Sequence, residues 1–157
     1  FGPLISENQR NRVLKYIKQG MAEGANLVYG GKKINEKGFF IQPTIFTEVT
    51  GEMKIAKEEI FGPVLSIEKF GNESLEEIAK RANSTTYGLS GSVWTNDISI
   101  GHRMAALIDS GQVSINCHAA VDSAIPFGGN KQSGWGREFG EEGLDSYLKT
   151  KATTIMY

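Results

Sequence analysis

The sequence predicts an α/β fold, in which a parallel sheet is built from strands joined by crossover helices. The prediction rests on the middle of the chain, where strand and helix candidates alternate. The strand candidates are residues 64–70, 91–95 and 112–116, and the helix candidates between them are residues 74–83 and 97–109. Strands separated by helices are usually parallel, because a right-handed crossover returns the chain to the same end of the sheet.

The first expected element is an amphipathic surface helix from Ser6 to about Glu23. Its apolar residues fall on one helical stripe, namely Val13, Leu14, Ile17 and Met21. Gly24 is placed to end it, because glycine readily adopts the backbone conformation of a helix C-terminus. The segment 39–49 is rich in aromatic and β-branched residues but contains Pro43, so we expect extended structure near a sheet edge.

The two central helices carry their own signals. Ser74 and Glu77 form a capping-box pattern, which satisfies backbone N–H groups at a helix start. The second helix turns three apolar residues inward and is ended by Gly111; these residues are Met104, Leu107 and Ile108.

The C-terminal part changes character. Residues 126–136 are dense in glycine and are not expected to form a regular element, whereas residues 141–148 can form a short helix. Residues 151–157 are β-prone, and a terminal strand needs a partner edge. We therefore expect one domain over residues 1–148 and an oligomerisation strand at residues 149–157, which makes a homo-oligomer, dimer or tetramer, the expected assembly.

The composition is that of an ordinary globular chain. Of 157 residues, 39% are hydrophobic and the net charge is −1, so electrostatic capture of nucleic acid is not expected. No apolar run reaches the length of a membrane span and no signal peptide pattern is present, so we expect a cytoplasmic protein without membrane association. The chain begins with Phe1 rather than Met, which suggests that an upstream portion is absent.

The most specific motif is the segment 57–64, Lys-Glu-Glu-Ile-Phe-Gly-Pro-Val. Pro63 forces a turn just before the strand and holds Glu59 and Phe61 at its mouth. A carboxylate there can accept hydrogen bonds from neighbouring ribose hydroxyls, and an aromatic ring can pack against a flat cofactor ring. The alternative is a solvated glutamate beside a turn phenylalanine, which would be the usual explanation for an isolated Glu-x-Phe.

This motif resembles the cofactor-contact motif of the NAD(P)-dependent aldehyde dehydrogenase superfamily, and residues 1–6, 83–89 and 126–138 resemble that family in the same order. The resemblance identifies the chain with the C-terminal part of the catalytic region. It implies that Glu59 binds the nicotinamide ribose hydroxyls of NAD or NADP and that Phe61 confines the nicotinamide. Hydride transfer needs such contacts, because the reacting carbons must be held close together.

The glycine loop at residues 128–136 does not fit a phosphate-binding loop, because Trp135 and Gly136 stand where Lys and Ser or Thr are required. By resemblance, residues 116–127 and this loop border the aldehyde tunnel, with Val121 and Phe127 as the expected wall residues. Packing alone is the alternative explanation for both.

Cys117, the only cysteine, lies beside His118, but neighbouring residues on a strand point to opposite faces and could not easily share a proton. The resemblance agrees, because the family's reactive cysteine and general base lie upstream of Phe1. We therefore expect no catalytic residue and no metal site in this chain. It would be inactive alone, and the full-length enzyme would oxidise an aldehyde to a carboxylic acid.

Two alternatives stay open. Residues 116–118, 122 and 136–140 are similar to enzymes that act on aromatic aldehydes such as phenylacetaldehyde. The chain could instead serve as a non-catalytic structural or oligomerisation module of an aldehyde dehydrogenase-like protein. The upstream sequence discriminates between enzyme and module, because only the enzyme needs a reactive cysteine there.

Overall fold

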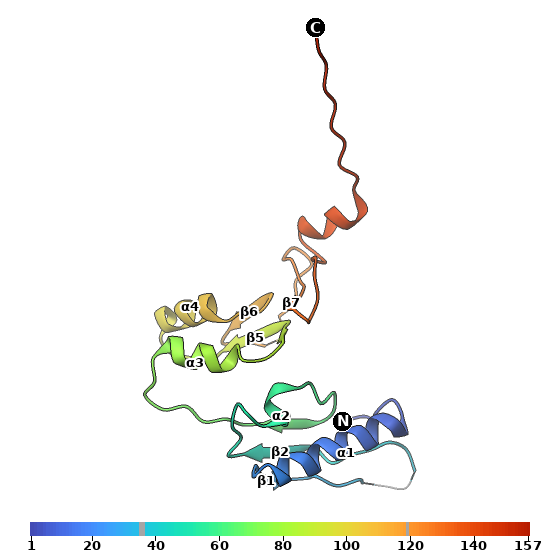
Figure 1. Ribbon diagram of the computed structural model, residues 1–157, viewed down its shortest axis with the longest axis vertical. Helices are drawn as coiled ribbons and strands as arrows, with labels where there is room; N and C mark the ends of the chain where they lie inside the picture. Colours follow the sequence, from blue (N-terminus) through green and yellow to red (C-terminus); the bar gives the residue numbers. More distant parts are fainter. Residues whose placement is uncertain (35–36, 119) are drawn as a thin grey trace. The chain divides into compact units, whose positions relative to one another are not determined.

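The computed structural model describes residues 1–34, 37–118 and 120–157, and the chain divides into two compact units, Phe1–Glu73 and Ser74–Tyr157. Both units mix helices with short strands (Figure 1). Within the described ranges, no helix is both long enough and apolar enough to cross a membrane.

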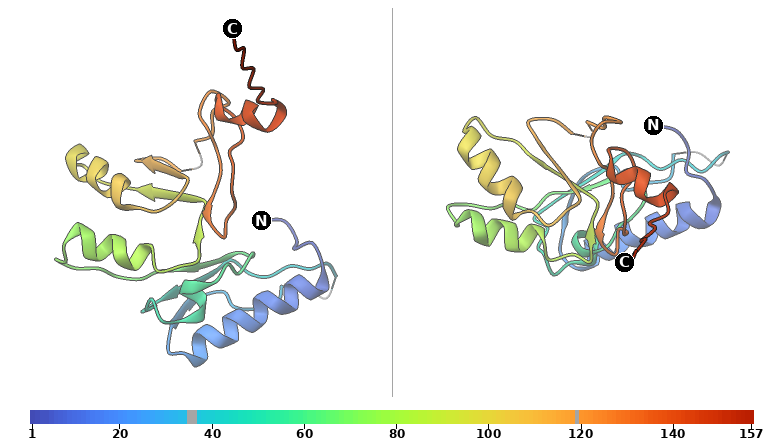
Figure 2. Two further views of the ribbon diagram at one scale, coloured as in Figure 1. Left: turned by 45° about the horizontal axis from the view of Figure 1, so that its top comes forward. Right: turned by 90° about the horizontal axis from the view of Figure 1, so that it is seen from above.

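Unit 1 packs a long helix against a three-stranded sheet of order β1-β2-β3. Strand β1 is antiparallel to β2, and β2 is parallel to β3. The elements in chain order are α1 (Glu7–Ala22), β1 (Asn26–Tyr29), β2 (Thr44–Thr47), α2 (Lys54–Lys57) and β3 (Val64–Ser66). Figure 2 shows α1 running along this sheet.

The helix α1 forms as its sequence predicts. The Ser6 hydroxyl accepts a hydrogen bond from the Gln9 backbone N–H at 3.2 Å and so caps the first turn. Val13 and Ile17, on the predicted stripe, pack with Phe46 of β2, and all three are almost fully buried. Burial of this stripe, rather than helix propensity, gives α1 a fixed place in unit 1.

The segment 39–49 does contain a strand, but its predicted place near a sheet edge is wrong. Strand β2 lies in the centre of the sheet, between β1 and β3. Pro43 is compatible with this position because it precedes the strand, whose first N–H, that of Thr44, donates to the Pro63 carbonyl at 2.8 Å. Strand β1 has no counterpart in the sequence prediction.

Unit 2 contains two helices beside a parallel strand pair. Helices α3 and α4 pack together, and α4 also contacts both strands of the β5–β6 pair. Strand β4 pairs antiparallel with β7. The elements are α3 (Leu75–Ala82), β4 (Tyr87–Gly88), β5 (Ser90–Val93), α4 (Ile98–Leu107), β6 (Gln112–Ile115), β7 (Asn130–Lys131) and a 3₁₀ helix (Glu142–Tyr147).

The predicted capping box and the predicted parallel pairing are both confirmed. The Glu77 N–H donates to the Ser74 hydroxyl at 3.2 Å, and the Ser74 N–H donates to the Glu77 carboxylate at 3.0 Å. Strands β5 and β6 pair in parallel across α4. However, β3 pairs with β2 of its own unit, so the three predicted strands do not by themselves form one parallel sheet. Strand β3 finds its partner in a segment that precedes it.

The C-terminal part differs from expectation in its glycine-dense segment. The glycine-dense segment 126–136 does contain a short strand, β7, and a bridge joins Phe127 to Glu138, so the segment folds back on itself. The expected helix at residues 141–148 is a 3₁₀ helix. Residues 149–157 are exposed and extended without strand pairing in this single chain, so their pairing with another subunit stays a prediction (Figure 1).

Candidate functional site

The motif segment forms a turn between α2 and β3. Ile60 points into the core of unit 1 and is 7% exposed, while Glu59 and Phe61 on either side of it are exposed. Phe61 is 77% exposed, and its backbone has a φ of +57°, in the left-handed region. Bulky residues are uncommon there, and held strain of this kind is concentrated at functional sites. The turn thus presents a carboxylate and an aromatic ring outward from one buried anchor.

Helix α1 supports the backbone of this turn. The Gln9 side-chain amide donates to the Phe61 carbonyl at 2.9 Å and to the Ile60 carbonyl at 3.2 Å. The Arg12 guanidinium donates to the Glu59 carbonyl at 3.2 Å. The sequence prediction missed both residues, because they lie far away in the chain and on a polar helix face that is usually only solvated.

Two neighbouring glutamates in the turn have different surroundings. The Glu58 carboxylate accepts a hydrogen bond from the Tyr16 hydroxyl at 2.6 Å and lies 3.7 Å from the Lys54 ammonium. The Glu59 carboxylate has no hydrogen-bond or ion-pair partner among the residues that the structure describes. The Glu58 carboxylate is therefore occupied by Tyr16 and Lys54, whereas the Glu59 carboxylate is available to accept hydrogen bonds from a ligand.

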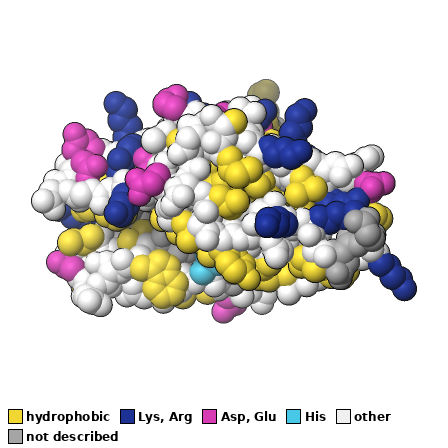
Figure 3. Space-filling view, turned by 90° about the horizontal axis from the view of Figure 1, so that it is seen from below, with side chains coloured by type: hydrophobic (Ala, Val, Ile, Leu, Met, Phe, Trp, Pro, Cys, Tyr) yellow, Lys and Arg dark blue, Asp and Glu magenta, His cyan; other side chains and the backbone are white. Residues whose placement is uncertain are grey.

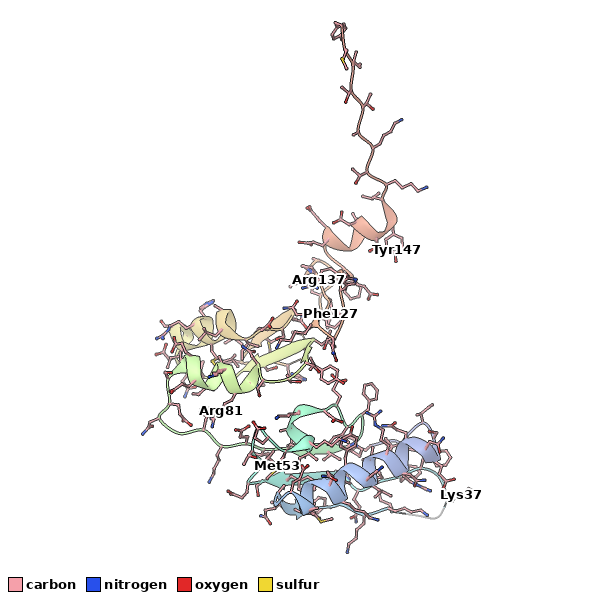
Figure 4. The ribbon with its side chains drawn as sticks, in the orientation of Figure 1. Lys37, Met53, Arg81, Phe127, Arg137 and Tyr147 are labelled. Atoms are coloured by element: carbon pink, nitrogen blue, oxygen red, sulfur yellow. The ribbon has the colours of Figure 1, made fainter. Side chains whose placement is uncertain are left out.

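The predicted wall residues, Val121 and Phe127, both lie in unit 2. Phe127 is half-buried and exchanges two backbone hydrogen bonds of 2.7 Å with Glu138. It lines a hollow of about 400 Å³, and Val121, 51% exposed, is not among the described residues that line it. The hollow is formed by Leu89, Phe127, Gly128, Gly129, Ser133, Gly134, Trp135, Gly136, Arg137, Glu138 and Ser146. Figure 4 labels Phe127 and Arg137 in this part of unit 2.

Arg137 fixes the shape of the glycine loop around that hollow. Its guanidinium donates to the Gly129 carbonyl at 3.0 Å, to the Gly136 carbonyl at 2.8 Å and to the Asn130 side chain at 2.9 Å. A planar guanidinium with several donors suits this task, because it satisfies loop carbonyls that no sheet or helix pairs.

The environment of Cys117 differs from the one assumed from the sequence. Strand β6 ends at Ile115, and Asn116 turns the chain with a φ of +56°. Its side chain accepts from the Thr95 N–H at 2.8 Å and donates to the Thr95 carbonyl at 2.9 Å. Cys117 is exposed, and the His118 Nδ1 lies 2.6 Å from the Ser92 hydroxyl. That imidazole nitrogen is therefore engaged by a serine.

Charged side chains do not gather by sign on the face drawn in Figure 3, where Lys, Arg, Asp and Glu are interspersed with apolar side chains. Such a mixed surface agrees with the net charge of −1.

Residues 1–153 match the sequence profile of the aldehyde dehydrogenase family. The chain belongs to the aldehyde dehydrogenase family. It is 50% identical over 153 residues to aldehyde dehydrogenase 1 of Tanacetum cinerariifolium, covering 98% of this chain and 30% of that protein. It is 49% identical over 156 residues to cytosolic 10-formyltetrahydrofolate dehydrogenase of Xenopus tropicalis, covering 99% of this chain and 17% of that protein.

Solved aldehyde dehydrogenases share the fold of this chain. The NAD⁺ complex of the Bacillus cereus enzyme matches with a TM-score of 0.89 and 50% identity, over 95% of this chain and 30% of that one. The Mycobacterium tuberculosis aldehyde dehydrogenase complexed with NAD⁺ matches with a TM-score of 0.88 and 47% identity, over 98% of this chain and 33% of that one. This aldehyde dehydrogenase chain thus spans a third or less of the length of these relatives.

Proposed function

We propose that the protein containing this chain oxidises an aldehyde to a carboxylic acid with NAD or NADP, and that this chain supplies contacts to the nicotinamide end of the cofactor. The observation that carries the proposal is the turn at Glu59 and Phe61, whose two functional side chains are exposed on a firmly held backbone. Family membership and the solved relatives with NAD⁺ support it.

The residues of the turn suit a nicotinamide riboside. The Glu59 carboxylate can accept hydrogen bonds from both ribose hydroxyls, and the exposed Phe61 ring offers a flat apolar surface. The cofactor, when bound, accepts a hydride; the chain's part is to orient it and limit its motion. Because the reactive cysteine is not expected in this chain, we propose that the 157 residues alone produce no NADH from an aldehyde.

The substitution Glu59→Gln in the intact protein tests this assignment. It keeps the shape of the side chain but removes the charge, so we expect the KM for NAD⁺ to rise about tenfold or more, as loss of a charge-assisted hydrogen bond implies. The unfolding temperature should not change, because Glu59 is exposed. Wild-type kinetics with both NAD⁺ and NADP⁺ would rule the assignment out.

Glu58→Gln is the matched control. It alters the adjacent carboxylate, which is bonded to Tyr16. We expect it to lower the unfolding temperature and to leave the KM for NAD⁺ within about twofold of the wild type, since the altered group faces α1.

The aldehyde wall is proposed to include Val121 and Phe127, and the substrate to be an aromatic aldehyde such as phenylacetaldehyde. Phe127 lies in a hollow together with Trp135, which supports an apolar substituent. Comparing kcat/KM for phenylacetaldehyde and for a short aliphatic aldehyde decides this point; a clear preference for the aliphatic one would contradict it.

We further propose a homo-oligomer, dimer or tetramer, joined through residues 149–157. These residues are exposed and form no strand pairs within the described chain, which leaves their backbone groups available to another subunit. A cytoplasmic location completes the proposal, and cell fractionation tests it.

A further inference from the structure

Three successive backbone carbonyls, those of residues 59, 60 and 61, accept hydrogen bonds from α1. The donors are the side chains of Gln9 and Arg12, which stand one helical turn apart on the same face. The next residue, Gly62, completes the contact, since a Cβ added there would come within 2.6 Å of the Val13 side chain. Four consecutive residues of the turn therefore rest directly on residues 9, 12 and 13 of the helix.

We propose that Gln9 is a positioning residue, assisted by Arg12, that sets the placement of Glu59 and Phe61 through the backbone of the turn. The inference rests on the proposed function, because it concerns how the cofactor contacts are held. Gln9 acts through carbonyl groups and is not assigned a contact with the reacting atoms.

The chemistry of the side chain fits this task. A glutamine amide carries two N–H donors on one nitrogen, and here both directions are used, one toward each of two adjacent carbonyls. The Phe61 carbonyl lies in the residue with the left-handed backbone, so the 2.9 Å bond restrains the unusual conformation directly. Without it, Phe61 could relax toward negative φ, and its ring would swing away from its present direction.

The helix is a rigid base for this contact. Val13 is 0% exposed and Ile17 is 1% exposed, so α1 is fixed by the core of unit 1. The carbonyls are thus held to a buried helix rather than to another loop. Side chains presented from so firm a base can keep the sub-ångström placement that hydride transfer requires.

Three substitutions of Gln9 in the intact protein separate the effect of its hydrogen-bond donors from the effect of its side-chain shape. Gln9→Glu keeps the shape but removes both donors and opposes the carbonyls with a negative charge. Gln9→Leu removes all polarity, and Gln9→Lys restores donors on a flexible chain. We expect the dissociation constant for NAD⁺, measured by calorimetry, to rise about tenfold in the Glu and Leu variants and to recover to within about threefold in the Lys variant.

Two further measurements distinguish positioning of the cofactor contacts from a general loss of stability. We expect the KM for the aldehyde to stay unchanged and the backbone N–H groups of residues 60–62 to exchange with deuterium faster in Gln9→Glu, while the core of α1 stays protected. Gln19→Leu is the matched control, since Gln19 lies on the same helix and donates to Glu23 instead of the turn. It should leave NAD⁺ binding unchanged.

The inference is overturned if Gln9→Glu binds NAD⁺ like the wild type, or if Gln19→Leu weakens binding equally. It is also overturned if aldehyde KM and NAD⁺ affinity deteriorate together. Glu59→Gln distinguishes this failure from that of the proposed function. If Glu59→Gln weakens NAD⁺ binding and Gln9→Glu does not, the positioning role alone is wrong; if neither has an effect, the cofactor site itself is wrong.

Discussion

Because Phe61 has a left-handed backbone, we predict that replacing this phenylalanine by glycine leaves the protein more stable than replacing it by alanine. An L-residue in this region costs about 1–2 kcal/mol. Glycine avoids that cost but loses about 0.5–1 kcal/mol more backbone entropy on folding. The free energy of unfolding of Phe61→Gly should therefore exceed that of Phe61→Ala by about 0.5–1 kcal/mol. The phenyl ring itself contributes little to stability. Phe61 is 77% exposed, so only about a quarter of the 1.5–3 kcal/mol gained by burying a whole phenylalanine side chain applies.

Urea midpoints of the intact protein measure this order, and calorimetry with NAD⁺ measures the function. Both variants lack the ring, so both should bind NAD⁺ more weakly by a similar factor whatever their stability. Phe70 offers the matched control, because it is also exposed, at 63%, and is not among the residues with positive φ. There the order should reverse, with Phe70→Gly less stable than Phe70→Ala, because glycine gives the unfolded chain more conformational freedom. The reasoning is refuted if Phe61→Ala is the more stable variant, or if NAD⁺ affinity follows stability.

Two further outcomes are expected. Deleting Lys151–Tyr157 should lower the mass of the protein in solution, measured by light scattering, because the tail would no longer pair with another subunit; an unchanged oligomer would count against this role. A hydrogen bond from the Gln19 side chain, with one from the Lys54 backbone N–H and the nearby Lys54 charge, lowers the pKa of Glu23 below its usual value, although partial desolvation opposes the shift. Because the folded pKa is the lower one, Glu23 stabilises the fold above the unfolded glutamate pKa, about 4.3, and loses that contribution as pH falls through the folded value. The urea midpoints of wild type and Glu23→Gln should thus converge in acid, and a gap independent of pH would contradict the assignment.

Elements defined by local signals could be predicted from the sequence. Helix α1 follows from an apolar stripe ended by Gly24, and α3 follows from a capping box whose two hydrogen bonds are both formed. Sheet membership could not be predicted in the same way. Strand β2 is central only because β1 pairs with it, and β7 is two residues long and exists only through β4. Such pairings depend on partners distant in sequence, which periodicity does not encode.

The candidate site likewise combines residues that local sequence signals predict with residues that they do not. Glu59 and Phe61 could be located at the mouth of a strand, because Pro63 restricts the preceding backbone. Their support could not, since Gln9 contacts carbonyls about fifty residues away and a backbone carbonyl has no sequence signal. Of the two predicted wall residues, Phe127 lines the hollow in unit 2, and Val121 is not among the described residues around it.

Gly62 joins this turn to the helix with no side chain between them, and that closeness affects how sequence variants should be interpreted. Val13, which it touches, would pass as an ordinary core position where any aliphatic residue of similar size is acceptable. Yet a methyl group added to the Val13 side chain would press on the backbone of the turn, which cannot move aside as a flexible side chain can. Substitutions of this buried valine should therefore leave the protein folded and abundant but weaken its affinity for the cofactor.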